Sequence, residues 1–398
     1  MMEHISVLNL HAVNMMNNLT DLFFDTFNKS AEAVYKAPAR INLIGEHIDY
    51  NGGKVLPACV SLYITGVVSK RDDDKICLKS TAFDSILEVN MNNIEDGKSF
   101  DWGMYPLGIF YILKKRGYNL LNGLNILFDS NIPLGSGLSS SAAILDLTAY
   151  IINDLYELNL SRKELVLLVK EVENDYCGLH NGIMDEAIIL LGNKNNAMLL
   201  DCASFEYNDY QMNLGNYRFV VLKTNKPRKL IESKYNERVS ECNKGLNKLK
   251  DYYNISNLCE LKTQDLPKVK EIINDDLIYK RVRHVISENE RVNLFSKAMQ
   301  NNEIMHMGEL LNLSDESLRD DYEVTGFHLD AITKAARLSG AIGARMTGAG
   351  FGGCAIALID KSNFDLFKEN VINIYFNETG IKPDVLMVDI VDGVNKIK

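Results

Sequence analysis

Hydrogen-bonding side chains are concentrated in the segment RINLIGEHIDYNGG, which spans residues 40–53. An apolar, strand-like run over residues 41–44 ends there at a glycine. Arg40 precedes this run, and the polar residues that follow the glycine are Glu46, His47, Asp49, Tyr50 and Asn51. A loop that faces solvent does not need so many donors and acceptors, whereas a pocket for a small polyhydroxylated molecule does. The segment therefore predicts such a pocket.

A glycine- and serine-rich loop, PLGSGLSSSAAI, occupies residues 133–144. It leads into an amphipathic helix whose apolar residues recur at helical spacing: Ile144, Leu147, Ile151 and Leu155. Glycines let the backbone approach a ligand closely, and the free N–H groups of a helix start attract anions. Serine is also a common helix cap, but three consecutive serines exceed what capping needs. We therefore predict a phosphate-binding loop, which is not a Walker A loop because no Lys-Ser/Thr pair follows the glycines.

A second glycine loop, GAGFGG at residues 348–353, matches the pattern G-x-G-x-x-G. A dinucleotide-binding loop of this pattern must lead into a helix, whereas the following CAIALID reads as a strand. Two interpretations remain open. The loop either lets the C-terminal half approach a ligand held by the N-terminal half, or forms a tight hairpin without ligand contact.

Two acidic residues in EVENDYCGLHNGIMDEA, Glu173 and Asp185, lie twelve residues apart with Gly178 and Gly182 between them. If Glu173 ends one helix and Asp185 begins the next, both carboxylates face one cleft. Such a pair suits a magnesium ligand and a general base. Solvated helix charges are the alternative, and by themselves these residues favour it.

Composition excludes several classes of protein. The net charge of −10, from 43 basic and 53 acidic residues, argues against a nucleic-acid partner. The seven cysteines include no Cys-x-x-Cys pair and are odd in number, which indicates neither a zinc site nor a disulfide framework. No signal-like N-terminus or membrane-length apolar run is present. We expect a cytoplasmic protein with no membrane partner.

The chain length of 398 residues favours two domains, and both halves read as α+β. Strand-like patterns dominate residues 34–127, and helical patterns cover about 162–190 and 327–338. The polar segment 203–211 is the best boundary. We therefore predict domains at 1–205 and 206–398.

Four stretches together resemble the galactokinase signature and the three motifs of the GHMP sugar and metabolite kinases: ARINLIGEHIDYNGG, PLGSGLSSSAA, NGIMDEAIILLG and RMTGAGFGGC. Two further stretches, DWGMYPLG and KYNERVSEC, also look like galactokinase segments. The resemblance implies a two-domain GHMP kinase fold with the active site between the domains. It also implies ATP- and magnesium-dependent phosphorylation of the anomeric hydroxyl of galactose.

The resemblance implies a role for each of several residues. Asp185 would be the catalytic base, and Arg40 would orient this base and stabilise the charge of the phosphoryl group during transfer. The two side chains must therefore meet across one cavity. Sugar contacts would come from Glu46, His47, Asp49, Gly182 and Tyr235. The phosphates of ATP would lie against Gly135, Ser136, Gly137, Leu138, Ser139, Ser140 and Ser141. The nucleotide would also contact Trp102 and Tyr105, and Mg²⁺ would bind Ser141 and Glu173.

Some of these roles have rivals in the sequence. Tyr235 shares helical spacing with Ile231 and Val239, so it could serve packing, and Trp102 could belong to the core. A metal site at His47 would need ligands that the sequence does not display.

The chain departs from the family pattern at three positions: Ile48, Glu186 and Leu145 stand where Thr, Gln and an acidic residue are usual. The isoleucine at position 48 makes this motif resemble that of N-acetylgalactosamine kinases, whereas the NGG that follows favours galactose as the substrate. Glu186 puts a second carboxylate beside the proposed base, and like charges raise a neighbour's pKa. We therefore expect a shifted pH optimum, and a pH–rate profile unchanged in Glu186→Gln would refute it.

Three functions follow as alternatives. Galactokinase activity is the main hypothesis, with galactose and ATP as small-molecule partners and a monomer as the expected state. A sugar-1-kinase for N-acetylgalactosamine or another sugar is the second. A non-catalytic sugar sensor that regulates a partner is the third, although such a protein could lose the phosphate loop or the base, and both are present here.

Overall fold

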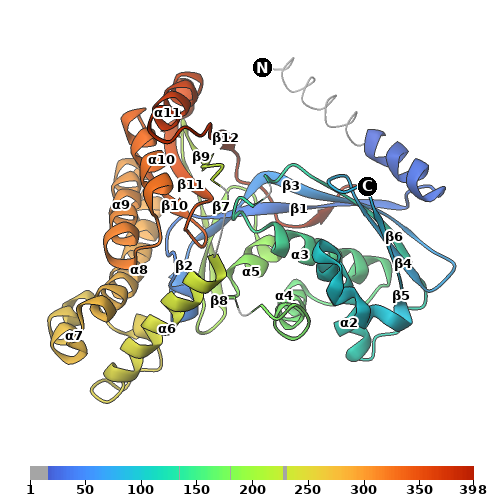
Figure 1. The fold of residues 1–398 in the computed structure, drawn as a ribbon, viewed down its shortest axis with the longest axis horizontal. Helices are drawn as coiled ribbons and strands as arrows, with labels where there is room; N and C mark the ends of the chain where they lie inside the picture. The colour runs from blue at the N-terminus through green and yellow to red at the C-terminus, as the bar shows by residue number, and fades with distance from the viewer. Residues whose placement is uncertain (1–16, 134, 180, 227–230) are drawn as a thin grey trace.

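The computed structural model describes residues 17–133, 135–179, 181–226 and 231–398. Its largest sheet has six strands and holds the N-terminal half together (Figure 1). In order across the sheet these are β13 (Asn395–Lys396), β1 (Ala33–Asn42), β3 (Pro57–Lys70), β6 (Leu124–Ser130), β4 (Lys75–Ser80) and β5 (Ile86–Asn90). Neighbouring strands are antiparallel except β4 and β6, which are parallel.

Four helices cover one face of this sheet (Figure 1): α2 (Met104–Lys115), α3 (Ser140–Leu155), α4 (Arg162–Glu171) and α5 (Met184–Leu191). Residues 17–27 form a helix on the opposite face. There Phe23 packs on Val34, Val67 and Leu127 in a small cluster separate from the main core. Strands β1, β3 and β6 therefore have apolar side chains packed on both faces, which explains why β1 is almost entirely buried.

A β-bulge in β1 changes the direction of the side chains that follow it. Before the bulge, Tyr35 faces the helices, because its hydroxyl donates to Asp154 of α3 at 2.5 Å. Side chains alternate along a regular strand, so residue 40, five positions later, would face away. The register shift between Pro38 and Ala39 reverses this alternation. Arg40 therefore points toward the helical layer.

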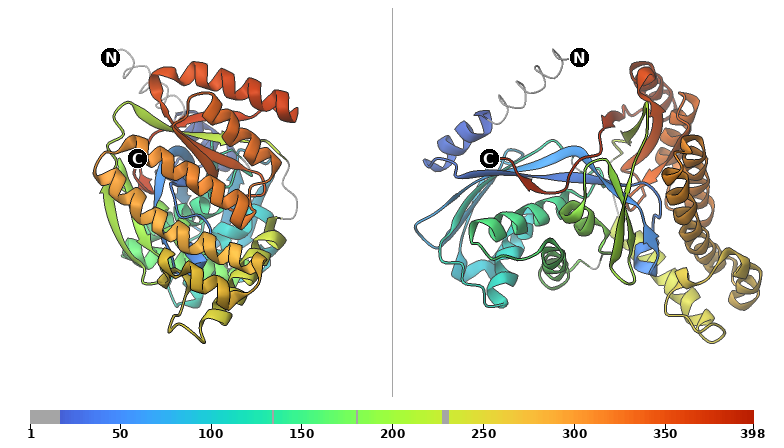
Figure 2. Two further views of the ribbon diagram at one scale, coloured as in Figure 1. Left: turned by 90° about the vertical axis from the view of Figure 1, so that its left-hand side faces the viewer. Right: turned by 180° about the vertical axis from the view of Figure 1, so that it is seen from behind.

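The second half is built on a four-stranded antiparallel sheet (Figure 2). Its strands, in order, are β10 (Gly343–Thr347), β11 (Cys354–Asp360), β9 (Tyr217–Lys223) and β12 (Asp384–Val388). The accompanying helices are α6 (Ile231–Leu249), α7 (Leu266–Ile273), α8 (Asp276–Gln300), α9 (Ile304–Ser317), α10 (Phe327–Leu338) and α11 (Phe364–Thr379). A third sheet lies between the halves and contains β2 (Lys54–Val55), β7 (Asn196–Asp201) and β8 (Glu206–Gln211).

The architecture agrees with the predicted α+β class in both halves, with two differences in detail. Helix α2 lies inside the region that the sequence predicts to be mainly strands. Its residues are buried on nearly every side, so they do not show the alternation of apolar and polar residues that identifies an amphipathic helix. The predicted helix over 162–190 is divided by a π-helical turn over Val172–Cys177 and a break before α5. Glu173 lies at the start of the π-helical turn, just after α4 ends, and Asp185 lies in the first turn of α5.

The proposed domain boundary at 205/206 falls between two paired strands, β7 and β8. In addition, β13 returns from the C-terminal end of the chain to pair with β1. Strands from both proposed domains therefore pair within the same sheets. In the part of the chain that the structure describes, no helix is both long and apolar enough to cross a bilayer.

Candidate active site

The side chains of Arg40 and Asp185 are in contact although 145 residues separate them in the chain. The guanidinium donates two parallel hydrogen bonds, from Nε to Oδ1 at 2.7 Å and from Nη2 to Oδ2 at 2.9 Å. Its third nitrogen donates to the Gly137 carbonyl at 3.0 Å. Such a forked pair fixes the orientation of the carboxylate. Arg40 is buried, whereas the Asp185 side chain remains 28% exposed, so the carboxylate is accessible.

The phosphate loop has a helix start without a side-chain cap. Ser139, the residue before α3, has a left-handed φ of 62° and makes no capping hydrogen bond. Its hydroxyl instead donates to Asp185 Oδ2. The capping alternative is therefore wrong for this serine, and the backbone N–H groups that begin α3 keep their capacity to bind an anion. Ser140 and Ser141, in the first turn of α3, are partly exposed.

The two glycine loops touch each other across the molecule. A Cβ placed on Gly348 would lie 2.9 Å from the carbonyl oxygen of Gly137. The Gly348 N–H also donates to Glu46 Oε1 at 2.9 Å. The loop between β10 and β11 therefore brings the C-terminal half against both the phosphate loop and the sugar motif, as the first interpretation of GAGFGG requires.

We expect Gly348→Ala to raise the KM for ATP by about tenfold, because a methyl group at this position would push the two loops apart and a φ of +84° strains any residue with a Cβ. Initial rates at varied ATP would measure this. Gly380→Ala is a matched control, since Gly380 has a similar φ of +73° with nothing within 4 Å of its Cβ position. Equal KM values for both variants would show that the contact between the loops does not matter.

Glu46 is held by groups from the C-terminal sheet. Its Oε1 atom accepts from Arg345 Nη2 at 2.9 Å and Thr347 Oγ1 at 3.0 Å, besides the Gly348 N–H. Arg345 is fully buried and also lies 3.9 Å from Glu288. These contacts all reach one carboxylate oxygen of Glu46, which leaves Oε2 as the atom that could accept a sugar hydroxyl.

Asp49 and Gly182 lie in contact. A Cβ on Gly182 would approach Asp49 Oδ2 to 1.9 Å, so only glycine permits this packing. Burial raises the pKa of Asp49 to about 6, and the charges of Asp185 and Glu46 contribute in the same direction. Three carboxylates from the sugar motif and from α5 therefore converge on one site, as a polyhydroxylated substrate requires.

An aromatic cluster surrounds His47. Its ring lies 5.7 Å from Tyr235 and 5.0 Å from Tyr322 between centroids, and its Nδ1 is 2.9 Å from the Tyr50 hydroxyl. Burial lowers the pKa of His47 to about 3, so the imidazole is neutral. Tyr235 packs here, but burial and then the charges of Asp49, Asp185 and Glu46 raise its pKa well above the usual range. Tyr235 therefore packs in the aromatic cluster and also lies beside the carboxylates of the site.

Glu173 is buried at the π-helical turn and pairs with Lys170 at 3.1 Å. Burial raises the pKa of Glu186 well above its usual range, and the charge and hydrogen bond of Glu173 raise it further. The shift of the pH optimum expected from Glu186 stays a prediction, which the pH–rate profile of Glu186→Gln tests.

Among the described residues, no cluster of three or more His, Cys, Asp or Glu side chains is arranged to hold a metal ion. Mg²⁺ needs few protein ligands when it arrives with a nucleotide, since water and phosphate oxygens complete its shell. The buried Glu173 carboxylate and the partly exposed Ser141 hydroxyl, on packed elements, are oxygen donors that fit this mode.

Of the remaining predicted positions, some side chains are partly exposed and others are buried. Trp102 and Tyr105, before and within α2, are partly exposed and pack against the main core. Ile48 is fully buried, and its side chain lies against Gly53, so the departure at this position affects loop packing. Leu145 is likewise buried in α3.

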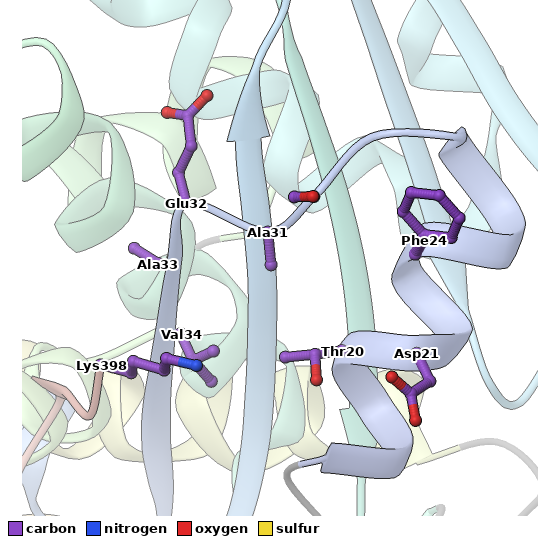
Figure 3. Close-up of a pocket in the computed structure, with 9 residues that line it drawn as sticks. Thr20, Asp21, Phe24, Ala31, Glu32, Ala33, Val34 and Lys398 are labelled. Atoms are coloured by element: carbon purple, nitrogen blue, oxygen red, sulfur yellow. The ribbon is translucent and has the colours of Figure 1, made fainter.

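A pocket of about 300 Å³ is lined by other residues. It is formed where the helix over residues 17–27 crosses the outer face of the first sheet near the C-terminus (Figure 3). Its lining includes Thr20, Asp21, Phe24, Glu32 and Lys398. None of the predicted site residues is among them.

Several supports of the site lie outside the predicted residues. His284 of α8 is buried, with Nε2 3.1 Å from the Glu46 carbonyl and Nδ1 2.8 Å from the Ser317 hydroxyl. Arg345 and Tyr322 are further supports that the sequence motifs do not include. Arg345 did carry a signal, because an arginine in an apolar strand directly before a glycine loop is a buried charge that needs an anionic partner.

Family models match three parts of the chain: the galactokinase galactose-binding signature at residues 21–70, the GHMP kinases N terminal domain at 105–193 and the GHMP kinases C terminal at 295–378. The mevalonate kinase of Methanococcus jannaschii shares the fold, with a TM-score of 0.65, 21% identity, and coverage of 90% of this chain and 98% of that one. Fold and loops thus define a GHMP kinase.

Closer similarity extends over nearly the whole chain. Galactokinases of Clostridium acetobutylicum and Enterococcus faecalis are 42% and 43% identical, over 97% and 95% of this chain and 100% and 99% of theirs. The structure of Lactococcus lactis galactokinase complexed with galactose has a TM-score of 0.92 at 39% identity, covering 96% of this chain and 100% of that one. The chain belongs to the galactokinase family.

Proposed function

We infer that this chain is an ATP-dependent galactokinase that transfers the terminal phosphoryl group of ATP to the anomeric hydroxyl of galactose. The observation that carries the proposed mechanism is the bidentate pair of Arg40 and Asp185 beside the phosphate loop. A base, a charged orienting group and an anion-binding helix start are thereby gathered in one place. These are the parts that phosphoryl transfer requires.

In the proposed reaction Asp185 accepts the proton of the anomeric hydroxyl. The sugar oxygen forms a bond to the γ-phosphorus as the bond between that phosphorus and the bridging oxygen of ADP breaks. Arg40 and the Ser139 hydroxyl hold the carboxylate in position by donating to its two oxygens. Arg40 also places positive charge next to the phosphoryl group, which stabilises the charge that shifts during transfer.

We propose that galactose lies among Glu46, Asp49 and Gly182, with the ring of Tyr235 as a wall. Carboxylates that accept particular hydroxyl groups reject sugars whose hydroxyls point elsewhere, because a buried acceptor would then lose its partner. Gly182 lets Asp49 lie against the chain before α5. His47 shapes this site through its contacts with Tyr50 and Tyr235.

We propose that the ATP phosphates lie on the backbone of residues 135–141, with Mg²⁺ held by Ser141 and Glu173. When bound, this ion would neutralise phosphate charge. Lys170 positions the Glu173 carboxylate by a salt bridge at 3.1 Å and also donates to the Gly182 carbonyl at 3.0 Å. We also propose a monomer, because both halves of the site come from one chain.

A coupled assay of ADP release with galactose, N-acetylgalactosamine, glucose and mevalonate tests this function. We expect turnover with galactose and at least a hundredfold lower kcat/KM with the other three, since the site is built from hydroxyl acceptors. Preferential turnover of N-acetylgalactosamine would support the second alternative. Binding of galactose and ATP without ADP release would support the sensor.

Asp49→Asn should weaken galactose binding by roughly 10- to 100-fold, because it removes a charged acceptor. It should also stabilise the protein near pH 8. The pKa of Asp49 is raised to about 6 in the folded protein, so the folded state binds the proton of this carboxyl more tightly than the unfolded state does. The free energy of unfolding of the wild type therefore falls as the pH rises from about 4 to about 6. The variant has no carboxyl here and keeps this free energy, which we place on the order of 1–2 kcal/mol for a partly exposed group.

Urea unfolding at pH 4, 6 and 8 measures this second effect, with calorimetric titration for the sugar. The difference between wild type and variant should be small at pH 4 and largest at pH 8. A difference in the free energy of unfolding that is the same at all three pH values would mean that folding does not shift the pKa of Asp49.

A further inference from the structure

A chain of hydrogen-bonding side chains connects the C-terminal half to the sugar motif. The Cys242 thiol on α6 lies 3.2 Å from the Tyr322 hydroxyl, which lies 2.7 Å from the Tyr50 hydroxyl. The Tyr50 hydroxyl lies 2.9 Å from Nδ1 of His47. We call these four side chains the tyrosine relay. Cys242, Tyr322 and His47 are buried, so their polar groups depend on one another for hydrogen bonds.

His47 needs outside contacts to keep its conformation. Its φ of 62° lies in the left-handed region, which is strained for a residue with a Cβ and persists only where the surroundings fix it. Asn51 holds the main chain by donating from Nδ2 to the His47 carbonyl at 3.0 Å. Tyr50 holds the ring through Nδ1. The conformation of the sugar motif at His47 therefore depends on both contacts.

The surroundings of His47 indicate which ring nitrogen carries the hydrogen. Burial lowers the pKa of His47 to about 3, and the backbone of Ala349 opposes this shift. A backbone group that favours the protonated ring is a carbonyl that accepts from a ring N–H. Nδ1 faces Tyr50, and Nε2 is buried without a hydrogen bond of full geometry in the described part of the chain, so this carbonyl faces Nε2. The neutral ring therefore carries its hydrogen on Nε2, and Nδ1 accepts from Tyr50.

Each member of the relay then donates toward His47. The single hydroxyl hydrogen of Tyr50 is used on Nδ1, so the Tyr50 oxygen accepts from Tyr322, and the Tyr322 oxygen accepts from the Cys242 thiol. Donors that all point the same way strengthen one another. The opposite direction would put a hydrogen on Nδ1 and leave Nε2 as a bare acceptor against the Ala349 carbonyl.

Tyr322 is held in place through its backbone. It ends the π-helical turn that follows α9. Arg238 on α6 donates from Nε to the Tyr322 carbonyl at 2.7 Å, and Arg281 on α8 donates to the Asp321 carbonyl at 2.6 Å. Glu241 accepts from both arginines, at 3.0 and 2.7 Å. Both arginines are buried, so the packing of α6 on α8 fixes where the Tyr322 hydroxyl lies.

We propose that Tyr322, acting through Tyr50, is a positioning residue that keeps the hydrogen of His47 on Nε2 and so holds the sugar motif against the loop between β10 and β11. The inference rests on the proposed sugar site. The relay acts on the bound sugar before and during transfer alike, so its loss should affect galactose binding more than kcat.

Tyr50→Phe, Tyr322→Phe and the double variant keep the rings and remove the hydroxyls. We expect the galactose Kd to rise about tenfold, about fivefold and, in the double variant, about tenfold, because Tyr322 acts only through Tyr50. Values of kcat should stay within about threefold of wild type. Calorimetry measures Kd, and initial rates of ADP release measure kcat. Tyr375→Phe is the matched control, since Tyr375 is fully buried and its hydroxyl donates to the Thr224 carbonyl at 2.9 Å. It should leave the galactose Kd unchanged.

Nitrogen NMR of protein labelled with ¹⁵N-histidine reads the tautomer without any sugar, because a protonated and a bare imidazole nitrogen give different shifts. The chain has seven histidines, and the signals lost in His47→Gln identify those of His47. We expect a hydrogen on Nε2 in wild type and a mixture of tautomers in Tyr50→Phe.

Separate results would overturn the inference and the proposed function. A hydrogen on Nδ1 of His47 in wild type would overturn the inference. So would a double variant whose galactose Kd rises about fiftyfold, the product of the single effects, because the two hydroxyls would then act independently. Lower thermal stability of Tyr322→Phe with an unchanged Kd would assign this hydroxyl to packing, and would also overturn it. If wild type neither binds galactose nor releases ADP in its presence, the proposed function fails, whatever the tautomer of His47.

Discussion

Asp185→Asn should lower kcat by about 10³-fold and leave galactose binding within a few fold of wild type. The carboxylate accepts the hydroxyl proton in the proposed reaction, and a positioned base contributes roughly 10² to 10⁴ in rate. Asparagine keeps the shape and one acceptor for the hydrogen bonds from Arg40 but cannot take the proton. Pre-steady-state and steady-state ADP release would measure turnover, and calorimetry would measure sugar binding.

The choice of asparagine matters because Arg40 is buried. Asp185→Ala should also abolish turnover while leaving sugar binding largely intact, but it leaves a buried guanidinium without its carboxylate, and breaking a buried pair costs about 3–5 kcal/mol. Asp72→Asn is the control, because the Asp72 side chain is fully exposed. If Asp185→Asn kept more than a tenth of wild-type turnover, the base would have to be assigned to another group.

Arg345→Met should destabilise the protein by about 3–5 kcal/mol and strongly weaken galactose binding. Arg345 is fully buried and donates to Glu46 at 2.9 Å and to the Asn42 carbonyl at 2.5 Å. It also faces Glu288. Burial by itself raises the pKa of Glu288, but Arg291, His284 and Arg345 overcome this and lower it to about 2. Removal of the guanidinium would leave two buried carboxylates with too little positive charge.

Urea unfolding would measure the stability loss, and titration with galactose the loss of affinity. Arg345→Lys keeps the charge without the fork, so its effects should be intermediate, and it stays informative if the methionine variant does not fold. Arg319→Met removes an exposed pair with Asp320 and should change stability by less than about 1 kcal/mol. If Arg345→Met matched Arg319→Met in stability and sugar affinity, the link from the C-terminal sheet to Glu46 would be unimportant.

Much of this site was predictable because its residues are neighbours in the chain. The phosphate loop is one segment that combines close-approach glycines, small residues and a helix start, and each of these properties is local. The same holds for the sugar motif, whose density of donors and acceptors is visible in a dozen residues. The strand after GAGFGG was also enough to exclude a dinucleotide-binding loop.

Other features depend on residues that are distant in sequence. The alternation of residues along β1 would have turned Arg40 away from the helices, and the bulge at Pro38 and Ala39 reverses it. The Ser139 hydroxyl looked available for capping or phosphate and instead bonds to Asp185. Glu186 looks in the sequence like a charged neighbour of the base, but burial and the neighbouring Glu173 raise its pKa well above the usual range.

The types of group at the site, and the reaction they suit, follow from short local patterns, since backbone conformation and side-chain chemistry act over a few residues. The orientation of Arg40, the raised pKa of Glu186 and the support of Glu46 by Arg345 come from packing between segments up to about 300 residues apart. Burial and pairing change hydrogen bonding and pKa by removing water, and which groups lose water is set only when the distant segments pack together.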